Sequence, residues 1–248
     1  MNCAKRRIAI KALAGVLLAG SGAMAWAAQV AGTIVNLSGP LMVRKADGSM
    51  KVLGVKSEVE QGDTLVSEKN TYAQIRFIDN SEITLRPGTT FKIEAFAYES
   101  GKPEADSASF SLLQGGLRSL TGLLGKRNKE KFQLKTPTAT IGIRGTTFVA
   151  QYVQPTTTTR SPQPGALLSG LHVFVIDGAI MLTNSGGSMN FSAGQFGFTP
   201  TMQQPPVMVP NNPALKFTPP PVFSMSTLPQ AQTQTGMTKP QTVDCEVR

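Results

Sequence analysis

The side chains that most often carry out catalysis are scarce in this chain of 248 residues. It has one histidine, His172, and two cysteines, Cys3 and Cys245. Hydrolysis needs either a nucleophile with a base and an orienting group, or a metal held by several ligands. His172 lies in an alternating apolar run, where a packed or surface residue is expected before a catalytic base, and Cys245 has no histidine or second cysteine near it. Neither a catalytic triad nor a metal site is indicated.

Carboxylates are the remaining candidates for chemistry, because glycoside hydrolysis uses a pair of acids without histidine. The acids that could serve are Asp63, Asp79, Glu82 and Asp177. Each is explained first as a turn or strand-edge residue, whose carboxylate hydrogen-bonds the nearby backbone. We therefore predict no catalytic residue, no metal ligand and no cofactor, and we keep a carboxylate-dependent glycan hydrolase as an alternative.

The N-terminus has the pattern of an export signal. Lys5, Arg6, Arg7 and Lys11 precede an apolar run over residues 12–23, and small residues follow up to Ala27. The run is shorter than the ~20 residues that a bilayer-spanning helix needs. We predict a cleaved signal peptide over residues 1–27, hence a periplasmic or secreted bacterial protein with no transmembrane segment in the mature chain. The alternative is an uncleaved signal anchor.

Removing that leader changes what the charge and the cysteines imply. The whole chain has a formal charge of +9, but four of its 24 basic residues lie in the leader, which leaves 20 against 15 acids. A modest positive charge gives little reason to expect a nucleic-acid partner. Cys245 is the only cysteine left, so no internal disulfide can form, and stability must come from packing.

The folded part is predicted to be all-β. From Val30 to Thr199, short alternating runs are separated by Gly, Asp, Asn or Pro every eight to twelve residues, which is typical of a sandwich or roll of short strands. Two hairpins are expected: residues 73–78 with 82–86, and residues 171–176 with 179–184 across Asp177-Gly178. Periodicity alone leaves open whether the strands form an antiparallel sandwich or a parallel roll.

Three segments depart from this pattern. Leucines spaced by three and four allow a helical turn within residues 112–131, which end in a basic cluster over 126–131. That cluster is either a solvated turn or a contact for phosphate, a lipid headgroup or an acidic glycan. Residues 154–169 are rich in Thr and Pro and are expected to form an exposed loop. Residues 201–248, rich in Pro, Gln and Thr, are predicted to be a mostly disordered tail, either a tether or docking strip or a dispensable end.

One string carries a family resemblance. Residues 136–148 read TPTATIGIRGTTF, residues 113–118 read LQGGLR, and Gly62-Asp63 and Pro87 come earlier. Together they closely resemble the FecR-like periplasmic domain family, over residues 32–153, and residues 171–199 resemble strands that often follow. We therefore place a FecR-like β domain at residues 28–200.

The resemblance implies an all-β extracytoplasmic domain. In the founding regulators this domain receives a signal from an outer-membrane transporter and passes it to a sigma factor. Those regulators have a cytoplasmic region and a membrane-spanning helix before the domain, whereas only a leader precedes Ala28 here. The resemblance therefore implies a binding role without direct control of a sigma factor.

Arg144 is the residue we single out for binding, together with Arg118. Gly142 and Gly145 flank Arg144 in a strand-like run, and glycines in strands mark bulges or close backbone approaches. The two arginines are expected to bind a carboxylate or phosphate. Alternatively, Arg144 is structural and pairs with Asp63, Asp79 or Glu82. No Gly-Lys-Ser/Thr ending is present, so a phosphate loop is not indicated.

Taken together, the sequence predicts an exported, non-catalytic binding module. Its partner is expected to be a protein or an envelope glycan, in signalling or envelope assembly, and the oligomeric state is left open. The alternative from a different class is a structural cell-envelope or surface protein that extends through its Thr- and Pro-rich segments.

Overall fold

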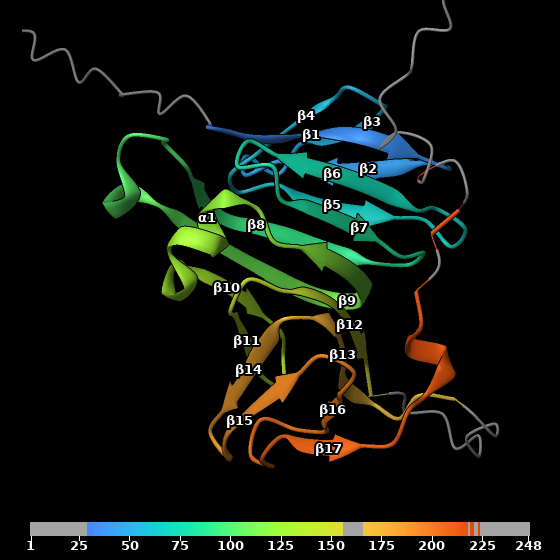
Figure 1. Cartoon of the computed structure of the whole chain (residues 1–248). Coiled ribbons are helices and arrows are strands. Elements are labelled where there is room, and N and C mark those ends of the chain that lie inside the picture. The colour runs from blue at the N-terminus through green and yellow to red at the C-terminus, as the bar shows by residue number, and fades with distance from the viewer. Residues whose placement is uncertain (1–28, 156–165, 218, 221–222, 224–248) are drawn as a thin grey trace, which may run out of the picture.

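Strands make up most of the residues that the computed structural model describes, which are 29–155, 166–217, 219–220 and 223 (Figure 1). The predicted all-β class is confirmed. The described helical segments are short: α1 (Leu123–Arg127), η1 (Pro103–Ala105), η2 (Lys129–Lys131) and η3 (Pro213–Leu215). None of the helices in these ranges is long and apolar enough to cross a bilayer. The predicted signal peptide, most of the 154–169 loop, and Cys245 lie outside the described residues.

The strands form two sheets that share β9 (Ser107–Leu120). Sheet A runs in the order β4 (Glu58–Glu60), β1 (Val30–Leu37), β6 (Ala73–Phe77), β7 (Glu82–Leu85), β9, β12 (Thr147–Val153), β13 (Gly170–Asp177), β16 (Phe196–Thr199), β17 (Val207–Val209). Sheet B runs in the order β3 (Met50–Leu53), β2 (Leu41–Arg44), β5 (Thr64–Ser67), β8 (Thr90–Ala97), β9, β10 (Phe132–Lys135), β11 (Thr140–Ile143), β14 (Ala179–Asn184), β15 (Gly187–Ser192). Only β9 and β10 pair in parallel among the described strands.

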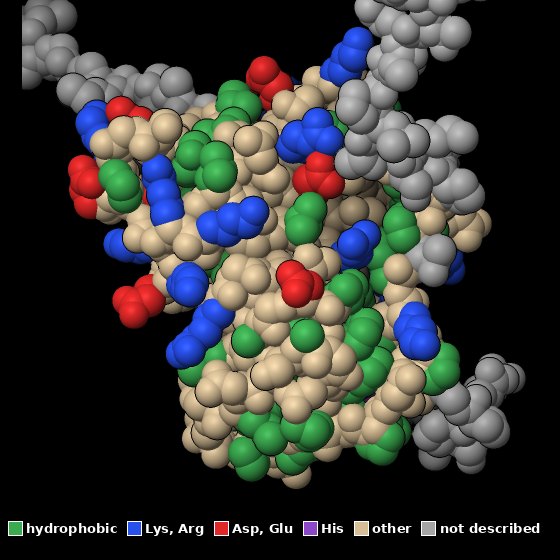
Figure 2. Space-filling model, in the orientation of Figure 1, with side chains coloured by type: hydrophobic (Ala, Val, Ile, Leu, Met, Phe, Trp, Pro, Cys, Tyr) green, Lys and Arg blue, Asp and Glu red, His purple; other side chains and the backbone are tan. Residues whose placement is uncertain are grey.

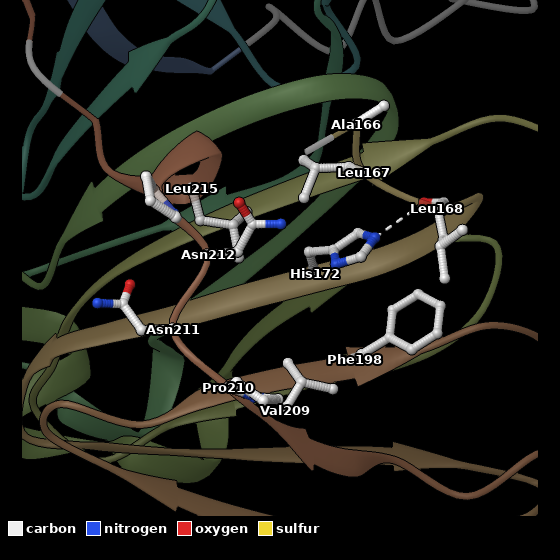
Figure 3. A pocket seen from close by; sticks show the side chains of 11 residues that line it. Ala166, Leu167, Leu168, His172, Phe198, Val209, Pro210, Asn211, Asn212 and Leu215 are labelled. Atoms are coloured by element: carbon white, nitrogen blue, oxygen red, sulfur yellow. Dashed lines mark hydrogen bonds between the residues drawn. The ribbon is translucent and has the colours of Figure 1, made fainter. Parts of the chain in front are cut away.

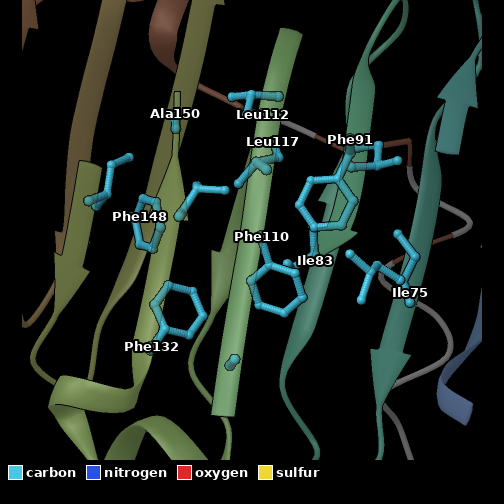
Figure 4. Close-up of a cluster of buried hydrophobic side chains, with 14 of the residues drawn as sticks. Ile75, Ile83, Phe91, Phe110, Leu112, Leu117, Phe132, Phe148 and Ala150 are labelled. Carbon is cyan, nitrogen blue, oxygen red and sulfur yellow. The ribbon is translucent and has the colours of Figure 1, made fainter. Parts of the chain in front are cut away.

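Alternation along each strand places one face of each sheet in a common core. Phe77 of sheet A lies 5.0 Å from the ring of Phe96 and 5.2 Å from that of Phe110, both in sheet B. Phe110 also packs against Phe91 and Phe132, and it lies at the centre of the cluster in Figure 4. The two sheets therefore pack face to face, and burial of these rings is the main stabilising contribution.

β9 passes from one sheet to the other at Gly115. Residues up to Gln114 pair with β8 in sheet B, whereas Gly115 to Leu120 pair with β12 in sheet A. Gly115 has φ +80°, and a Cβ atom on it would lie 2.6 Å from the Cα of Thr89. Only glycine fits this bend.

The first predicted hairpin is confirmed and the second is wrong. β6 and β7 pair directly, with Asn80 at φ 62° in the turn between them. β13 and β14 do not pair, because the chain at Asp177-Gly178 crosses from sheet A to sheet B. A two-residue type I′ hairpin turn needs positive φ at both central residues, and here only Gly178 has it. Strand-turn-strand periodicity is the same for a hairpin and for a crossing between sheets.

The leucine-rich stretch over 112–131 begins as strand and ends in short helical segments. β9 continues to Leu120, and the expected helical turn is limited to α1 followed by η2. Leu112 and Leu117 both point into the core, on either side of the bend at Gly115. The leucines spaced by three and four thus belong partly to the end of β9 and partly to α1, which is the helical turn that the sequence allowed.

The first part of the predicted tail, residues 201–217, packs on the folded domain. β17 pairs with β16, and η3 follows it across the outer face of sheet A, with the Leu215 side chain fully buried. Arg86 on that face donates hydrogen bonds to the carbonyls of Ala214 (3.3 Å) and Lys216 (3.1 Å). The segment is held because the sheet already offers it a surface to pack on. Residues 224–248 lie outside the described part of the chain.

Candidate binding groove

A groove of about 700 Å³ lies on the outer face of sheet B, over strands β10, β11 and β14. Because Leu134 and Ile141 point into the core, their strand neighbours point outward and line the groove. We call this site the sheet B groove. It is lined by Lys129, Glu130, Phe132, Gln133, Thr140, Gly142, Ile143, Arg144, Met181 and Thr183.

Gly142 leaves the floor of the groove open. Its strand neighbours across the sheet are Gln133 and Met181. A Cβ atom on Gly142 would meet nothing closer than the carbonyl oxygen of Met181 at 3.9 Å, and its φ is not in the left-handed region. Neither backbone conformation nor packing requires glycine here. Glycine weakens a strand interior relative to other residues, so its presence favours a role in admitting an occupant.

Arg144 lies at the end of the groove, immediately after β11. Its backbone N–H donates to the carbonyl of Ala179 (3.0 Å) and to Oγ1 of Thr146 (3.2 Å), which fixes the start of its side chain. The side chain itself is exposed. No described acid forms a salt bridge with it. A guanidinium without an internal carboxylate is available to bind one from outside.

An ion pair between the buried Asp106 and Arg127 holds the helical segment beside the groove in place. Asp106, whose side chain is buried, accepts hydrogen bonds from Arg127 (Nε to Oδ2, 2.7 Å) and from Asn128 (3.0 Å). The hydrogen bond from Arg127 holds the pKa of the Asp106 carboxyl below its usual value. Arg127 also lies over the ring of Tyr98 at 4.5 Å. α1 and η2 are thereby tied to the β8–β9 connection, and η2 presents Lys129 to the groove.

The predicted basic cluster over 126–131 therefore has two parts. Arg127 and Asn128 are structural, whereas Lys126, Lys129 and Lys131 are exposed. Figure 2 shows Lys and Arg side chains gathered over the side of the molecule that carries α1 and β10. Since Lys129 and Arg144 line the groove and Glu130 is its one acid, its net charge is positive.

The structure does not bring Arg118 and Arg144 together. Leu117 points into the core, so Arg118 lies on the outer face of sheet A, between Thr84 and Val149. Arg144 lies on the outer face of sheet B. Arg118 is half-buried, and its Nε atom is buried without a hydrogen-bond partner. The two arginines cannot act as one fork.

The acids considered as internal partners of Arg144 are engaged elsewhere. Lys45 lies 2.9 Å from Asp63, and Arg76 lies 2.8 Å from Glu82. Asp79 is buried and accepts from the hydroxyl of Ser81 (2.6 Å) and from the backbone N–H of Leu124 (3.2 Å). These three carboxylates stabilise turns and strand pairs, as the turn interpretation expects.

The remaining candidates for chemistry are separated from one another. Asp177 is exposed at the end of β13. His172 is 7% exposed on the outer face of sheet A, where its ring stacks on Phe198 with the centroids 4.5 Å apart. Burial lowers the pKa of His172, so the imidazole is neutral near pH 7. Within the described ranges, no three residues of the types His, Cys, Asp and Glu are grouped so that they could hold a metal ion.

Sequence reasoning found Arg144 and Lys129 but not their neighbours. Met181 and Thr183 face the groove because β14 pairs with β11. Gln133 faces it because β10 pairs with the other edge of β11. The pairing of β11 with β14 joins residues about 40 positions apart in the chain. The one local signal was Gly142 beside Arg144, a glycine inside a strand.

Comparison with known proteins places this site in a family. Residues 63–181 match the family model described as FecR protein. This stretch, which includes most of the groove, is therefore a FecR domain, and the predicted family is confirmed. The match begins and ends later than the 32–153 range expected from the resemblance. No curated protein matches the chain.

Two kinds of solved structure are similar in part. A candidate anti-sigma factor from Parabacteroides distasonis, solved in two crystal structures, has 12% identity and a TM-score of 0.44 over 60% of each chain. The chain thus spans less than two thirds of that protein. A structure described as a cell surface anchoring domain has 21% identity and a TM-score of 0.25, covering 25% of this chain and 82% of the other.

Proposed function

We propose that the chain is an exported, non-catalytic binding module whose FecR domain engages a protein partner through the sheet B groove. The observation that carries the proposal is an open, net-positive groove whose Arg144 has no internal acid. The predicted signal peptide supports a periplasmic or secreted location, and the resemblance to FecR regulators supports a role in signalling or envelope assembly.

The groove suits an extended segment of a partner that carries a carboxylate. Arg144 and Lys129 offer charge-assisted donors near one end, while Met181, 39% exposed, offers an apolar surface. Gly142 exposes the strand backbone between them. Exposed charges of this kind contribute more to association rate and specificity than to affinity, so binding is expected to weaken as salt rises.

Two of the four carboxylate candidates, Asp63 and Asp79, support a binding role over hydrolysis. Asp63 and Asp79 are about 99% and 98% buried, and each makes hydrogen bonds that a turn or strand connection needs. Acids in that position have little access to a polysaccharide.

Site-specific photocrosslinking in intact envelopes tests the proposal. A photoreactive residue at position 181, in place of Met181, lies in the groove. Position 50, in place of Met50 (59% exposed) on edge strand β3, is the control. We expect a protein captured at position 181 only, and its loss with Arg144→Ala but not with Arg44→Ala, an exposed arginine outside the groove. Equal capture from both positions, or capture that survives Arg144→Ala, would refute the proposal. Crosslinking to glycan alone would replace the protein partner with a glycan.

A further inference from the structure

A second cavity lies on the outer face of sheet A, separate from the sheet B groove. It has a volume of about 400 Å³ and lies between residues 166–168 and the segment 209–215, over β13 and β16 (Figure 3). We call it the His172 pocket. Its lining is mostly apolar, with Leu167, Phe198, Val209 and Leu215 among its walls, and no lysine, arginine, aspartate or glutamate is in it.

The hydrogen bond of His172 fixes what its ring offers to an occupant. Nε2 lies 2.8 Å from the carbonyl oxygen of Leu168. A carbonyl oxygen can only accept, so Nε2 must carry the proton, and a neutral imidazole then has a lone pair on Nδ1. No residue in the described ranges is hydrogen-bonded to Nδ1. The ring therefore presents an acceptor to the pocket, and it needs a donor from the occupant.

The asparagines of the pocket add donors. Asn212 accepts a hydrogen bond from the backbone N–H of Ala214 with its Oδ1 atom (2.9 Å), which leaves its Nδ2 amide free to donate. Asn211 is exposed at the rim. A group that both donates and accepts, such as a hydroxyl, matches an imidazole acceptor together with an amide donor.

Charge and size restrict the occupant further. A charged ligand would lose its hydration among apolar walls with no opposite charge to pair with, which is costly. A volume of about 400 Å³ is within the range of small-molecule sites. We propose that the His172 pocket binds a small neutral ligand, an apolar ring that carries a hydroxyl group. The site is independent of the sheet B groove, so either proposal can fail without the other.

His172 is itself a specific probe, since it is the only histidine in the chain. Long-range ¹H–¹⁵N spectra of the untagged full chain therefore show one imidazole. We would titrate phenol, with toluene as the apolar match that lacks the hydroxyl and benzoate as the charged match. We expect phenol to shift the Nδ1 resonance in a saturable way, toluene to bind more weakly without that shift, and benzoate to leave the ring unchanged.

Variants then assign the effect to the pocket. His172→Phe keeps a ring against Phe198 but removes the acceptor, and it should weaken phenol binding by about two- to tenfold while leaving toluene binding unchanged. If that variant fails to fold, Leu168→Trp, which alters a side chain 56% exposed at the rim, should fill the pocket and abolish the phenol shift. Equal affinity for phenol and toluene, tighter binding of benzoate, or a phenol shift that survives Leu168→Trp would overturn the proposal.

Discussion

The bend of β9 at Gly115 gives the sharpest test of the fold, because this strand belongs to both sheets. The change is Gly115→Ala, which adds one methyl group at a residue with φ +80°. The added carbon would lie 2.5 Å from Oγ1 of Thr89, 2.6 Å from its Cα and 2.7 Å from the carbonyl oxygen of Gly88. Two of these three atoms belong to the backbone, so the clash cannot be relieved by rotating a side chain.

The expected loss of stability follows from these contacts. Holding a non-glycine residue at positive φ costs about 1–3 kcal/mol. Overpacking against fixed atoms costs about 1–3 kcal/mol more. The shift also disturbs Thr89, whose hydroxyl bonds both the N–H (3.0 Å) and the C=O (2.9 Å) of Gly116. Alanine also lowers the conformational entropy of the unfolded chain, which offsets about 0.4–1 kcal/mol of the lost stability. The free energy of unfolding should therefore fall by about 2–5 kcal/mol, a large share of the 5–15 kcal/mol typical of a domain.

Gly142→Ala is the matched control, because it makes the same chemical change at a strand position with open space around the new carbon. It should leave the free energy of unfolding unchanged or raise it by up to about 1 kcal/mol. Urea denaturation followed by circular dichroism, with both m-values recorded, measures the two variants against the unmodified chain. Equal stability of the two variants would show that β9 does not bend through a site that excludes a side chain.

Three further changes test the core, the ion pair and the C-terminal segment. Phe110→Ala removes the ring at the centre of the aromatic cluster and should cost about 3–5 kcal/mol in the same denaturation assay; a loss under 1 kcal/mol would contradict the packing. Asp106→Asn should lower stability at pH 7. Because folding lowers the pKa of Asp106, the ionised carboxylate contributes to stability above about pH 3.8, and this contribution is lost as the pH falls through the pKa of the folded state. The free energy of unfolding of the variant should therefore fall less on acidification than that of the unmodified chain. Parallel profiles of stability against pH would refute this. Leu215→Ala removes about 2 kcal/mol of apolar burial, which should speed hydrogen exchange at the Lys216 amide roughly thirtyfold. The exchange of β9 amides should stay unchanged. No acceleration at Lys216 would mean that Leu215 does not hold the segment.

The faces of the strands could be predicted from the sequence, because alternation is a local property. Alternation in the first predicted hairpin puts Ile75 and Phe77 on one face of their strand and Ile83 and Leu85 on one face of the next, and all four are buried. The same alternation says nothing about which strands become neighbours, since pairing depends on contacts between distant segments. The error at Asp177-Gly178 has this cause. A Cβ atom on Gly178 would lie 2.4 Å from the carbonyl oxygen of Gly145. Glycine at position 178 therefore allows the backbones of two distant turns to pack closely, and no local sequence pattern reveals that contact.

The candidate site was predictable only in part for the same reason. Arg144 was singled out because glycines flank it, and Gly142 does mark an open position in a strand. Pairing Arg144 with Arg118 assumed that two basic residues of the family strings lie together. Arg118 lies on the outer face of sheet A, and Arg144 lies on the outer face of sheet B. In a regular strand, Leu112 and Leu117 would point to opposite faces, but both point into the core because β9 changes sheets between them. The face of Arg118 therefore could not be found by counting along the strand.

The C-terminal segment shows where an argument from composition stops. A stretch rich in Pro and Gln buries too little apolar surface to fold alone, and on that ground residues 201–248 are predicted to be a mostly disordered tail. Residues 201–217 do not fold independently, because they pack on a sheet that the rest of the domain forms. Few anchors then suffice: Leu215 is fully buried, and the guanidinium of Arg86 binds two carbonyls and lies 5.2 Å from the centre of the Phe217 ring. Prolines reduce the entropy that such a segment loses on docking. A proline-rich flank beside a β domain should therefore be examined for one buried leucine and one carbonyl-binding arginine before it is assigned to disorder.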